Sequence, residues 1–186
     1  MKKIEQLFIA SNNKGKIKEI KTILGSIVKD FLIPEDLKIT EKVIEDGKTF
    51  LENAKKKAEY FYDKTGILTL SDDSGLEVDI LDGAPGVNSA RFAGENADDL
   101  ENNIKLLDIM RNIPEDKRRA QFRCIMVLKG EKTLEIAEGI CKGKISSKMK
   151  GLSGFGYDPL FIPENYNKTF AELGNKVKNK ISHRRK

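Results

Sequence analysis

The stretch Leu7-Phe8-Ile9-Ala10, followed by the polar Ser11-Asn12-Asn13, decides the fold class of this chain. Four consecutive apolar residues before a polar turn are typical of a short buried strand. Apolar side chains then recur at helical spacing from Ile17 to Leu24, and Gly25 follows as a common helix-ending residue. The segment therefore predicts a strand, a turn and a helix in succession.

The same alternation of strands and helices continues along the chain. It predicts one α/β domain over residues 1–186, with a central mixed sheet flanked by helices and with the hairpin as a possible second lobe. Gly- and Asp-rich loops remain at Ser71–Gly75, Leu81–Gly94 and Gly151–Pro159, and loops of this kind often carry function. The further predicted elements are a helix over about Thr49–Lys64, a strand over Ile67–Leu70, a helix over about Asp98–Arg111 with the stripe Leu100, Ile104 and Leu107, and a hairpin over Ala120–Lys142.

Composition and charge argue against several classes of protein, namely nucleic-acid-binding, membrane-spanning and secreted proteins. The net charge is +5, but the lysines alternate with glutamates at helical spacing, which favours a solvated face over a nucleic-acid surface. Apolar runs stay far below the ~20 residues of a membrane span, and Met1-Lys2-Lys3 precedes no apolar signal region, so we expect a cytoplasmic protein. Cys124 and Cys141 are predicted to be two buried thiols without a disulfide.

Acidic residues cluster after the predicted strand Ile67–Leu70. Asp72 and Asp73 stand side by side, and their repulsion raises one carboxyl pKa unless a cation offsets it. Oxygen ligands of this kind suit Mg²⁺, whereas an Asx turn that caps a loop explains the pair equally well. Glu45, in Glu45-Asp46-Gly47, either adds a carboxylate or belongs to an ordinary helix-entry turn. Both interpretations stay open on spacing alone.

Two groups of lysines are candidates for binding an anion. Of Lys55, Lys56 and Lys57, only Lys57 falls at the edge of the apolar stripe of its helix, which favours either a phosphate ligand or a snorkelling side chain. The turn Ser11–Lys16 offers backbone N–H groups at a helix N-terminus together with two lysines. No Walker A loop or Rossmann glycine pattern occurs, so a kinase or a dehydrogenase is disfavoured.

The C-terminal tail contains the only histidine, His183. A single His and two distant cysteines nearly exclude a zinc site. Taken by itself, the basic tail from Ser182 to Lys186 is interpreted as a frayed end.

Four separated segments of the chain are informative together. They are Ser11–Glu19, Asp72–Leu76 with Gly83–Gly86, Gly154–Pro159 and Ser182–Arg184, and Ser89–Phe92 fits as well. In this order they resemble the inosine/xanthosine triphosphate pyrophosphohydrolases. The resemblance implies two lobes with the active site in the cleft between them, a homodimer, and Mg²⁺-dependent hydrolysis of ITP, dITP and XTP to the monophosphate and pyrophosphate. No nucleic acid or membrane is implied as a partner.

The resemblance also implies a role for individual residues. Asp73 is the implied base, and Lys57 the catalytic lysine; which of Asp72 and Asp73 is base and which is metal ligand stays open. Phe155 would stack on the purine, and Arg184 would donate to its O6 acceptor, where adenine has a donor amine. The remaining implied residues are Ser11, Asn12, Asn13, Lys14, Gly15, Lys16 and Lys178 at the phosphates, Glu45, Asp72 and Asp73 at the metal, Ser74 beside it, and Gly156, Tyr157, Asp158 and His183 at the base.

The chain departs from the family pattern at three places. Asn12 replaces a glycine, which Asn can substitute because it tolerates positive φ. Lys176-Val177 replaces residues that are commonly acidic before Lys178. The sequence stops at Lys186, where relatives continue into a helix, so we expect either a truncated sequence or a loosely held tail. Two rivals remain: a related pyrophosphatase for modified pyrimidine or methylated nucleotides, and a basic RNA-binding module.

Overall fold

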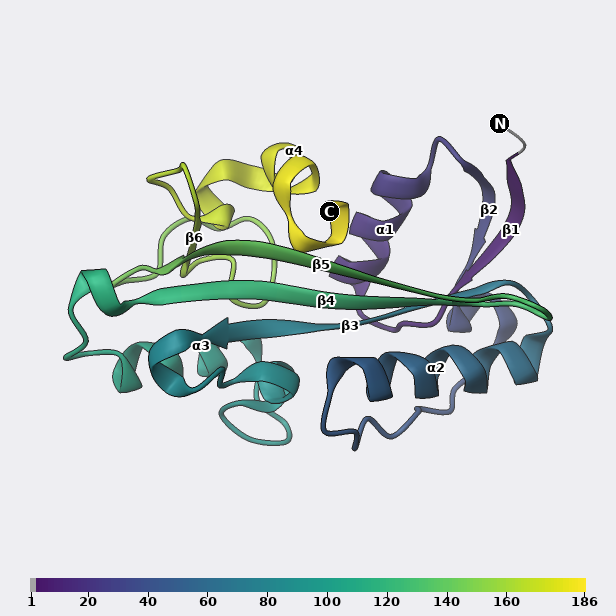
Figure 1. The fold of residues 1–186 in the computed structure, drawn as a ribbon, viewed down its shortest axis with the longest axis horizontal. Helices are drawn as coiled ribbons and strands as arrows, with labels where there is room; N and C mark the ends of the chain where they lie inside the picture. The colour runs from purple at the N-terminus through teal and green to yellow at the C-terminus, as the bar shows by residue number, and fades with distance from the viewer. Residues whose placement is uncertain (1–2) are drawn as a thin grey trace. The chain divides into compact units, whose positions relative to one another are not determined.

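A computed structural model describes residues 3–186 as an α/β fold with a six-stranded mixed sheet (Figure 1). Met1 and Lys2, on which the argument against a signal peptide rests, lie outside the described residues. The strand order is β2-β1-β3-β4-β5-β6. The elements are β1 (Ile4–Ile9), α1 (Lys14–Leu24), β2 (Val28–Leu32), α2 (Phe50–Thr65), β3 (Thr69–Val78), α3 (Asp99–Ile109), β4 (Arg119–Lys129), β5 (Leu134–Ile145), β6 (Phe161–Pro163) and α4 (Phe170–Ile181).

The chain divides into two compact units. The first unit comprises the chain up to Asp73 together with Cys124–Glu138, and the second comprises Ser74–Arg123 and Gly139–Lys186. The strands β3, β4 and β5 each contribute residues to both units. The predicted hairpin is confirmed as β4 and β5, but it does not form a lobe of its own, because its tip belongs to the first unit and its base to the second.

Alternation along β1 organises the first unit. Leu7 and Ile9 join a core with Ile17 and Ile20 of α1, whereas Phe8 on the other face packs against Phe61 of α2. Successive side chains of a strand point to opposite faces, so a buried apolar strand requires a cover on each side. The helices α1 and α2 provide these covers on opposite faces of the strands of this unit (Figure 1).

An apolar cluster forms the core of the second unit, and α3 contributes to it differently from the prediction. Leu106 and Met110 are buried in this cluster, whereas Leu100 is 54% exposed and Ile104 is 52% exposed. The predicted stripe of α3 was therefore largely wrong. Asn102 takes a core-facing position instead, because its amide donates to Ala90 O and accepts from Ala93 N. Periodicity of apolar residues does not reveal such a satisfied polar side chain.

The strand β3 is much longer than predicted. The segment Ser71–Gly75 was expected to be a loop after a short strand, but it continues β3 without interruption to Val78. Ser71, Asp72 and Asp73 are buried and Ser74 is half-buried, and Ser71 Oγ donates to Ala54 O of α2 at 2.6 Å. Buried polar groups that find partners can occupy a central strand, which the low β propensity of Asp and Gly obscures.

The C-terminal residues are held firmly, contrary to the expectation of a frayed or loosely held tail. His183 and Arg184 are 3% and 7% exposed, in a single 3-10 turn that follows α4. Cys124 and Cys141 are buried thiols that are not joined in a disulfide, as predicted. Within residues 3–186, no helix has both the length and the apolar character that crossing a membrane requires.

Candidate active site

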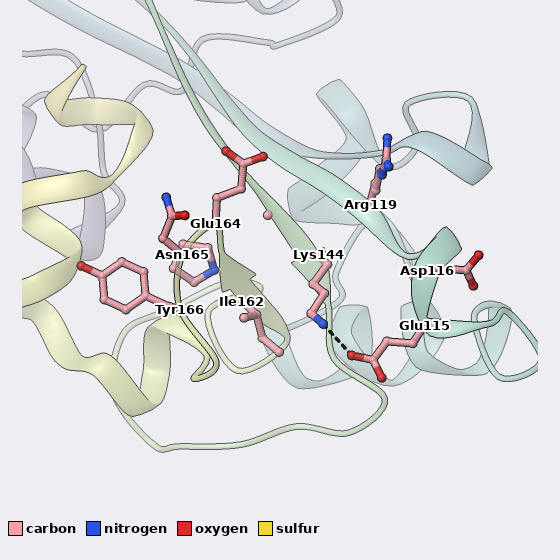
Figure 2. A pocket seen from close by; sticks show the side chains of 10 residues that line it. Glu115, Asp116, Arg119, Lys144, Ile162, Glu164, Asn165 and Tyr166 are labelled. Carbon is pink, nitrogen blue, oxygen red and sulfur yellow. Dashed lines mark hydrogen bonds and ion pairs between the residues drawn. The ribbon is translucent and has the colours of Figure 1, made fainter.

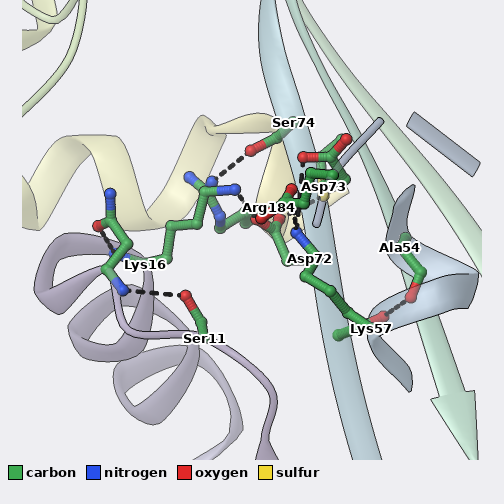
Figure 3. A network of polar contacts seen from close by, with 12 residues as sticks. Ser11, Lys16, Ala54, Lys57, Asp72, Asp73, Ser74 and Arg184 are labelled. Carbon is green, nitrogen blue, oxygen red and sulfur yellow. Dashed lines mark hydrogen bonds and ion pairs between the residues drawn. The ribbon is translucent and has the colours of Figure 1, made fainter. Parts of the chain in front are cut away.

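An acid and lysine cluster lies in the first unit, around the neighbouring carboxylates of β3 (Figure 3). Asp72 and Asp73 are 1% and 7% exposed, and lysines from two helices reach them. Lys16 comes from the first turn of α1, and Lys57 comes from the middle of α2. The helical position that distinguished Lys57 is confirmed, because Lys57 is 7% exposed whereas Lys56 is exposed and pairs with Asp46.

Both carboxylate oxygens of Asp72 are engaged. Oδ1 lies 2.6 Å from Lys16 Nζ, and Oδ2 lies 3.0 Å from the thiol of Cys124 on β4. A buried charge needs such partners, since an unpaired one costs several kcal/mol. This pairing leaves Asp72 less suited than its neighbour to bind a metal or to accept a proton. The sequence showed Cys124 only as a buried thiol, with no signal of this contact.

Asp73 is placed differently. Its Oδ1 lies 3.7 Å from Lys57 Nζ, and that ammonium also lies 2.6 Å from Glu45 Oε2. Its Oδ2 is buried and has no hydrogen-bond partner among residues 3–186. Burial raises the pKa of Asp73 above its ordinary value, and the charges of Lys57 and Lys16 together with the side chain of Asn53 oppose that rise only in part. Asp73 is therefore the carboxylate with both an unused oxygen and a perturbed pKa.

Glu45 and Asp73 are the residues that fit a magnesium ion. Their carboxylates converge on one ammonium, so the site already gathers two acidic groups around a cation. Within residues 3–186, no cluster of three or more His, Cys, Asp or Glu side chains forms a metal cage. Mg²⁺ does not need one, since it binds through one or two carboxylates and completes its shell with water and phosphate oxygens. The unused Oδ2 of Asp73 suits such a ligand.

The predicted turn between β1 and α1 is confirmed as a helix N-terminus. Asn13 caps α1, with its Oδ1 accepting from Lys16 N at 3.0 Å, and Ser11 Oγ accepts from Asn13 N at 3.1 Å. Lys14 and Gly15 form the first turn. Asn12 does not use the positive φ that was invoked for it. The turn thus presents unpaired helix N–H groups and a lysine, which together attract an anion.

A second cluster lies in the second unit, on the loop before β6 and on α4. Asp158 Oδ2 accepts from Lys178 Nζ at 2.6 Å and from Phe155 N at 2.9 Å, so one carboxylate fixes both the lysine and the loop. Lys178 is 2% exposed, with its ammonium 4.3 Å from the centre of the Phe155 ring. Lys178 was expected to bind the phosphates. Its partners within this unit are Asp158 and Phe155, which were expected to bind the purine base.

The C-terminal turn supplies the other groups of this cluster. Arg184 Nη2 donates to Ser74 Oγ at 2.6 Å, and Arg184 Cζ lies 5.8 Å from the centre of the Phe155 ring. His183 stacks on Phe122 of β4 at a centroid distance of 5.0 Å. Ser74 directly follows Asp73 in β3, so consecutive residues of one strand belong to the two clusters.

The loop next to Phe155 is tied to α3 by residues that the sequence did not single out. Gly156 N donates to Asp99 Oδ2 at 2.6 Å, and Asn103 Nδ2 donates to Gly156 O at 2.8 Å. Tyr157 is 4% exposed, its hydroxyl donates to Ser89 O, and burial raises its pKa well above the ordinary value. Tyr157 therefore supports the loop from within the core.

Comparisons with known proteins agree over nearly the whole chain. Residues 7–186 match the model of the Ham1 family. A dITP/XTP pyrophosphatase from Desulforamulus reducens is 49% identical over 97% of this chain and 90% of the relative, and one from Clostridium perfringens is 47% identical over 97% and 92%. Among solved structures, the Ham1 protein of Staphylococcus aureus has a TM-score of 0.85 at 40% identity, and a HAM1 protein from Coxiella burnetii has 0.86 at 36%; each alignment covers 97% of this chain and 93% of the other.

Proposed function

The chain belongs to the Ham1 family, and from that premise we propose that it is a nucleoside triphosphate pyrophosphohydrolase. Its substrates are the non-standard purine nucleotides ITP, dITP and XTP, which it cleaves with Mg²⁺ to the monophosphate and pyrophosphate. Relatives named dITP/XTP pyrophosphatase at 42–49% identity support the reaction class. The observation that carries the proposal is Asp73, a buried carboxylate with one unused oxygen beside Lys57.

The first unit supplies the phosphate chemistry in this proposal. Asp73 accepts the proton of the attacking water, a task that a raised carboxyl pKa favours by bringing it nearer to the working pH. Lys16 and Lys57, with the N-terminus of α1, neutralise the charge on the phosphate oxygens. Glu45 and Asp73 hold Mg²⁺, which when bound adds charge neutralisation and orients the phosphates.

The second unit supplies recognition of the base. Phe155 offers a ring on which a purine stacks, and Lys178 and Asp158 fix that ring and its loop. Arg184 is a donor at every accessible pH, so it matches the O6 acceptor of hypoxanthine and xanthine and opposes the amine of adenine. A donor that is left without an acceptor in a buried site costs binding free energy, so ATP should bind less well than ITP.

A panel of nucleoside triphosphates tests this function. With Mg²⁺ present, we expect ITP, dITP and XTP to yield equal amounts of pyrophosphate and monophosphate, and ATP, CTP and UTP to react at least tenfold more slowly. Omission of Mg²⁺ should abolish turnover. Preferred cleavage of modified pyrimidine nucleotides would move the protein to the related pyrophosphatase class. Salt-dependent RNA binding without nucleotide turnover would reject the enzyme altogether.

We also propose that the protein acts as a homodimer. The apolar side chains Leu100, Met149 and Leu152 line one open cavity of about 530 Å³ in the second unit, and Leu152 is fully exposed. Ile104 extends this apolar surface along α3 with 52% exposure. A second copy that covered these side chains would explain an apolar stripe outside the core. Sedimentation should give a dimer for the native chain and a monomer for Leu152→Glu.

A further inference from the structure

We propose that the second unit contains an accessory binding site for a phosphate-bearing anion, in a cavity around Arg118. The cavity has a volume of about 420 Å³ and lies beside the base of the β4–β5 hairpin. None of its lining residues belongs to either cluster described above. The proposal concerns binding alone, so it stands apart from the proposed catalytic activity.

Arg118 is a buried cation that is held by backbone carbonyls, and the nearby Glu115 carboxylate acts on it only through space. It is 6% exposed, and its guanidinium donates to three backbone carbonyls: Ile113 O at 2.9 Å, Met110 O at 2.6 Å and Ser146 O at 3.2 Å. Within residues 3–186, no carboxylate makes an ion pair or a hydrogen bond with it. A guanidinium has five N–H donors, so two remain after these three bonds. An anion in the adjoining cavity would stabilise a buried charge of this kind.

The other charged residues of this cavity favour the same ligand. Lys144 and Lys150 line it together with Arg118, and Glu115 is the only acid, so three cations face one carboxylate. Glu115 pairs with Lys144 at 2.5 Å, but its side chain is 79% exposed, and solvent screens such a pair strongly. The net charge of the lining is therefore positive by two, and Ser146 and Ser147 add hydroxyl groups to the wall.

A neighbouring cavity serves as an internal comparison (Figure 2). It is larger, at about 540 Å³, and shares Glu115 and Lys144 with the Arg118 cavity. Its charged residues are Glu115, Asp116 and Glu164 against Arg119 and Lys144, which leaves a net negative charge and no buried cation. The two cavities thus differ in sign, and only the Arg118 cavity suits an anion.

Phosphate is the anion class that matches this donor set. Arginine and lysine side chains with hydroxyl groups bind phosphate oxygens through charge-assisted hydrogen bonds. The backbone of Lys150 is fixed, because its N–H donates to Pro159 O and its carbonyl accepts from Thr169 Oγ1, so this lysine starts from a rigid position. The phosphate can be inorganic or can belong to a nucleotide, and the experiment separates these sources.

Titration of the ¹⁵N-labelled full chain with inorganic pyrophosphate, followed by amide chemical shifts, tests the site. We expect saturable shifts at Ser146, Ser147 and Asn167, which line the cavity. Lys150→Gln should weaken the affinity read from these amides about tenfold, the loss of one charge-assisted hydrogen bond. Lys148→Gln is the matched control: it removes the same charge from an exposed neighbour outside the cavity and should leave the affinity unchanged.

A parallel titration with inosine monophosphate identifies the source of the phosphate. If it shifts the same amides at lower concentration than pyrophosphate does, the site accepts nucleotides; if it shifts them at higher concentration, the site prefers the inorganic anion. Absence of saturable shifts at these amides in 20 mM NaCl with both ligands would overturn the proposal. An equal loss of affinity in Lys150→Gln and Lys148→Gln would overturn it too, since it would indicate a diffuse charge effect.

Discussion

The two units hold their charged groups in different ways. In the first unit, the carboxylates and lysines alternate, with Lys16 on Asp72 and Lys57 between Glu45 and Asp73. In the second unit, the buried Lys178–Asp158 ion pair fixes an aromatic ring, and Arg184 donates to the Ser74 hydroxyl. In the first unit, an anion can take over the lysines and a metal can take over the carboxylates that now pair with them. The second unit suits a flat, neutral group with polar edges. The proposed function assigns the arrangement in the first unit to the phosphates of a nucleotide and that in the second unit to its base.

The largest effect that this comparison predicts is on Asp73. Asp73→Asn should lower kcat for ITP by about 10³-fold or more, because it removes the group assigned as the general base and as a metal ligand. Steady-state pyrophosphate release measures this change. Asp46→Asn is the control, since Asp46 is an exposed carboxylate paired with Lys56, and we expect wild-type turnover. Near-normal turnover by a folded Asp73→Asn protein would contradict the assignment.

Because the pKa of Asp73 is raised, Asp73→Asn should increase stability although it lowers activity. A carboxyl whose pKa is higher in the folded than in the unfolded state contributes stability at low pH and loses it as pH rises through the folded pKa. The ionised carboxylate therefore destabilises the fold at neutral pH, and the neutral amide does not. Thermal unfolding should show a higher Tm for Asp73→Asn at pH 7 and equal Tm values below about pH 3.5. An unchanged difference across this range would contradict the shift.

Lys57→Ala is expected to lower kcat/KM for ITP by about 10²-fold, because Lys57 supports both Glu45 and Asp73. Since Lys57 lowers the pKa of Asp73, its removal should also move the acidic limb of the kcat/KM profile to higher pH. Lys56→Ala removes the same charge from the exposed neighbour and should leave both quantities unchanged. Equal, small effects of the two substitutions would show that Lys57 has no special position.

Much of the fold follows from local patterns, and the misses have a physical reason. The strand, turn and helix that begin at Leu7 were predicted correctly, because an uninterrupted apolar run and a capped helix are local signals. The helix predicted over about Asp98–Arg111 is confirmed as α3. The prediction failed at Ser71–Gly75 and for the buried face of α3, where polar groups replace apolar ones. Their partners come from distant segments, which no local window contains. The helix α4 was missed as well, and Gly174 with φ 75° interrupts its helical backbone.

The site was predictable to a different degree in the two units. Helical position alone distinguished Lys57 from Lys55 and Lys56, since burial of one helix face is a periodic property. Roles at the base came only from the family resemblance. The Lys178–Asp158 pair and the Cys124–Asp72 contact join residues 20 and 52 positions apart, so they depend on tertiary packing.

Substitutions in the second unit should change the selectivity between substrates and should not slow every substrate alike. Arg184→Ala should reduce kcat/KM for ITP by roughly 5- to 150-fold, the cost of 1 to 3 kcal/mol for losing a buried polar partner, and should change the slow ATP rate little. The ITP/ATP ratio therefore falls. Arg185→Ala, an exposed neighbour in the same turn, should keep the ratio. Equal losses for ITP and ATP would instead make Arg184 a phosphate ligand.

The smallest expected effect is that of substituting Cys124. It tests whether a neutral side chain helps to position the charged groups of the first unit. The Cys124 thiol lies 3.0 Å from Asp72 Oδ2, and Asp72 Oδ1 holds Lys16. Cys124→Ala removes this contact, so Asp72 loses one restraint and Lys16 is positioned less well for the phosphates. We expect KM for ITP to rise about threefold, with kcat nearly unchanged, since a thiol is a weak donor and its bond to the carboxylate contributes about 1 kcal/mol or less.

A serine at position 124 separates the effect of the hydrogen bond to Asp72 from the effect of filling space. Cys124→Ser keeps a donor that can reach Asp72, and a hydroxyl donates more strongly than a thiol, so KM should return toward the native value. Cys141→Ala is the matched control, because Cys141 is also a buried thiol but its Sγ lies 4.0 Å from Lys142 O, in the second unit. It should lower stability through a small cavity and leave KM unchanged. If Cys124→Ser and Cys124→Ala raise KM equally, the thiol acts only by filling space, and the positioning of Lys16 depends on Asp72 alone.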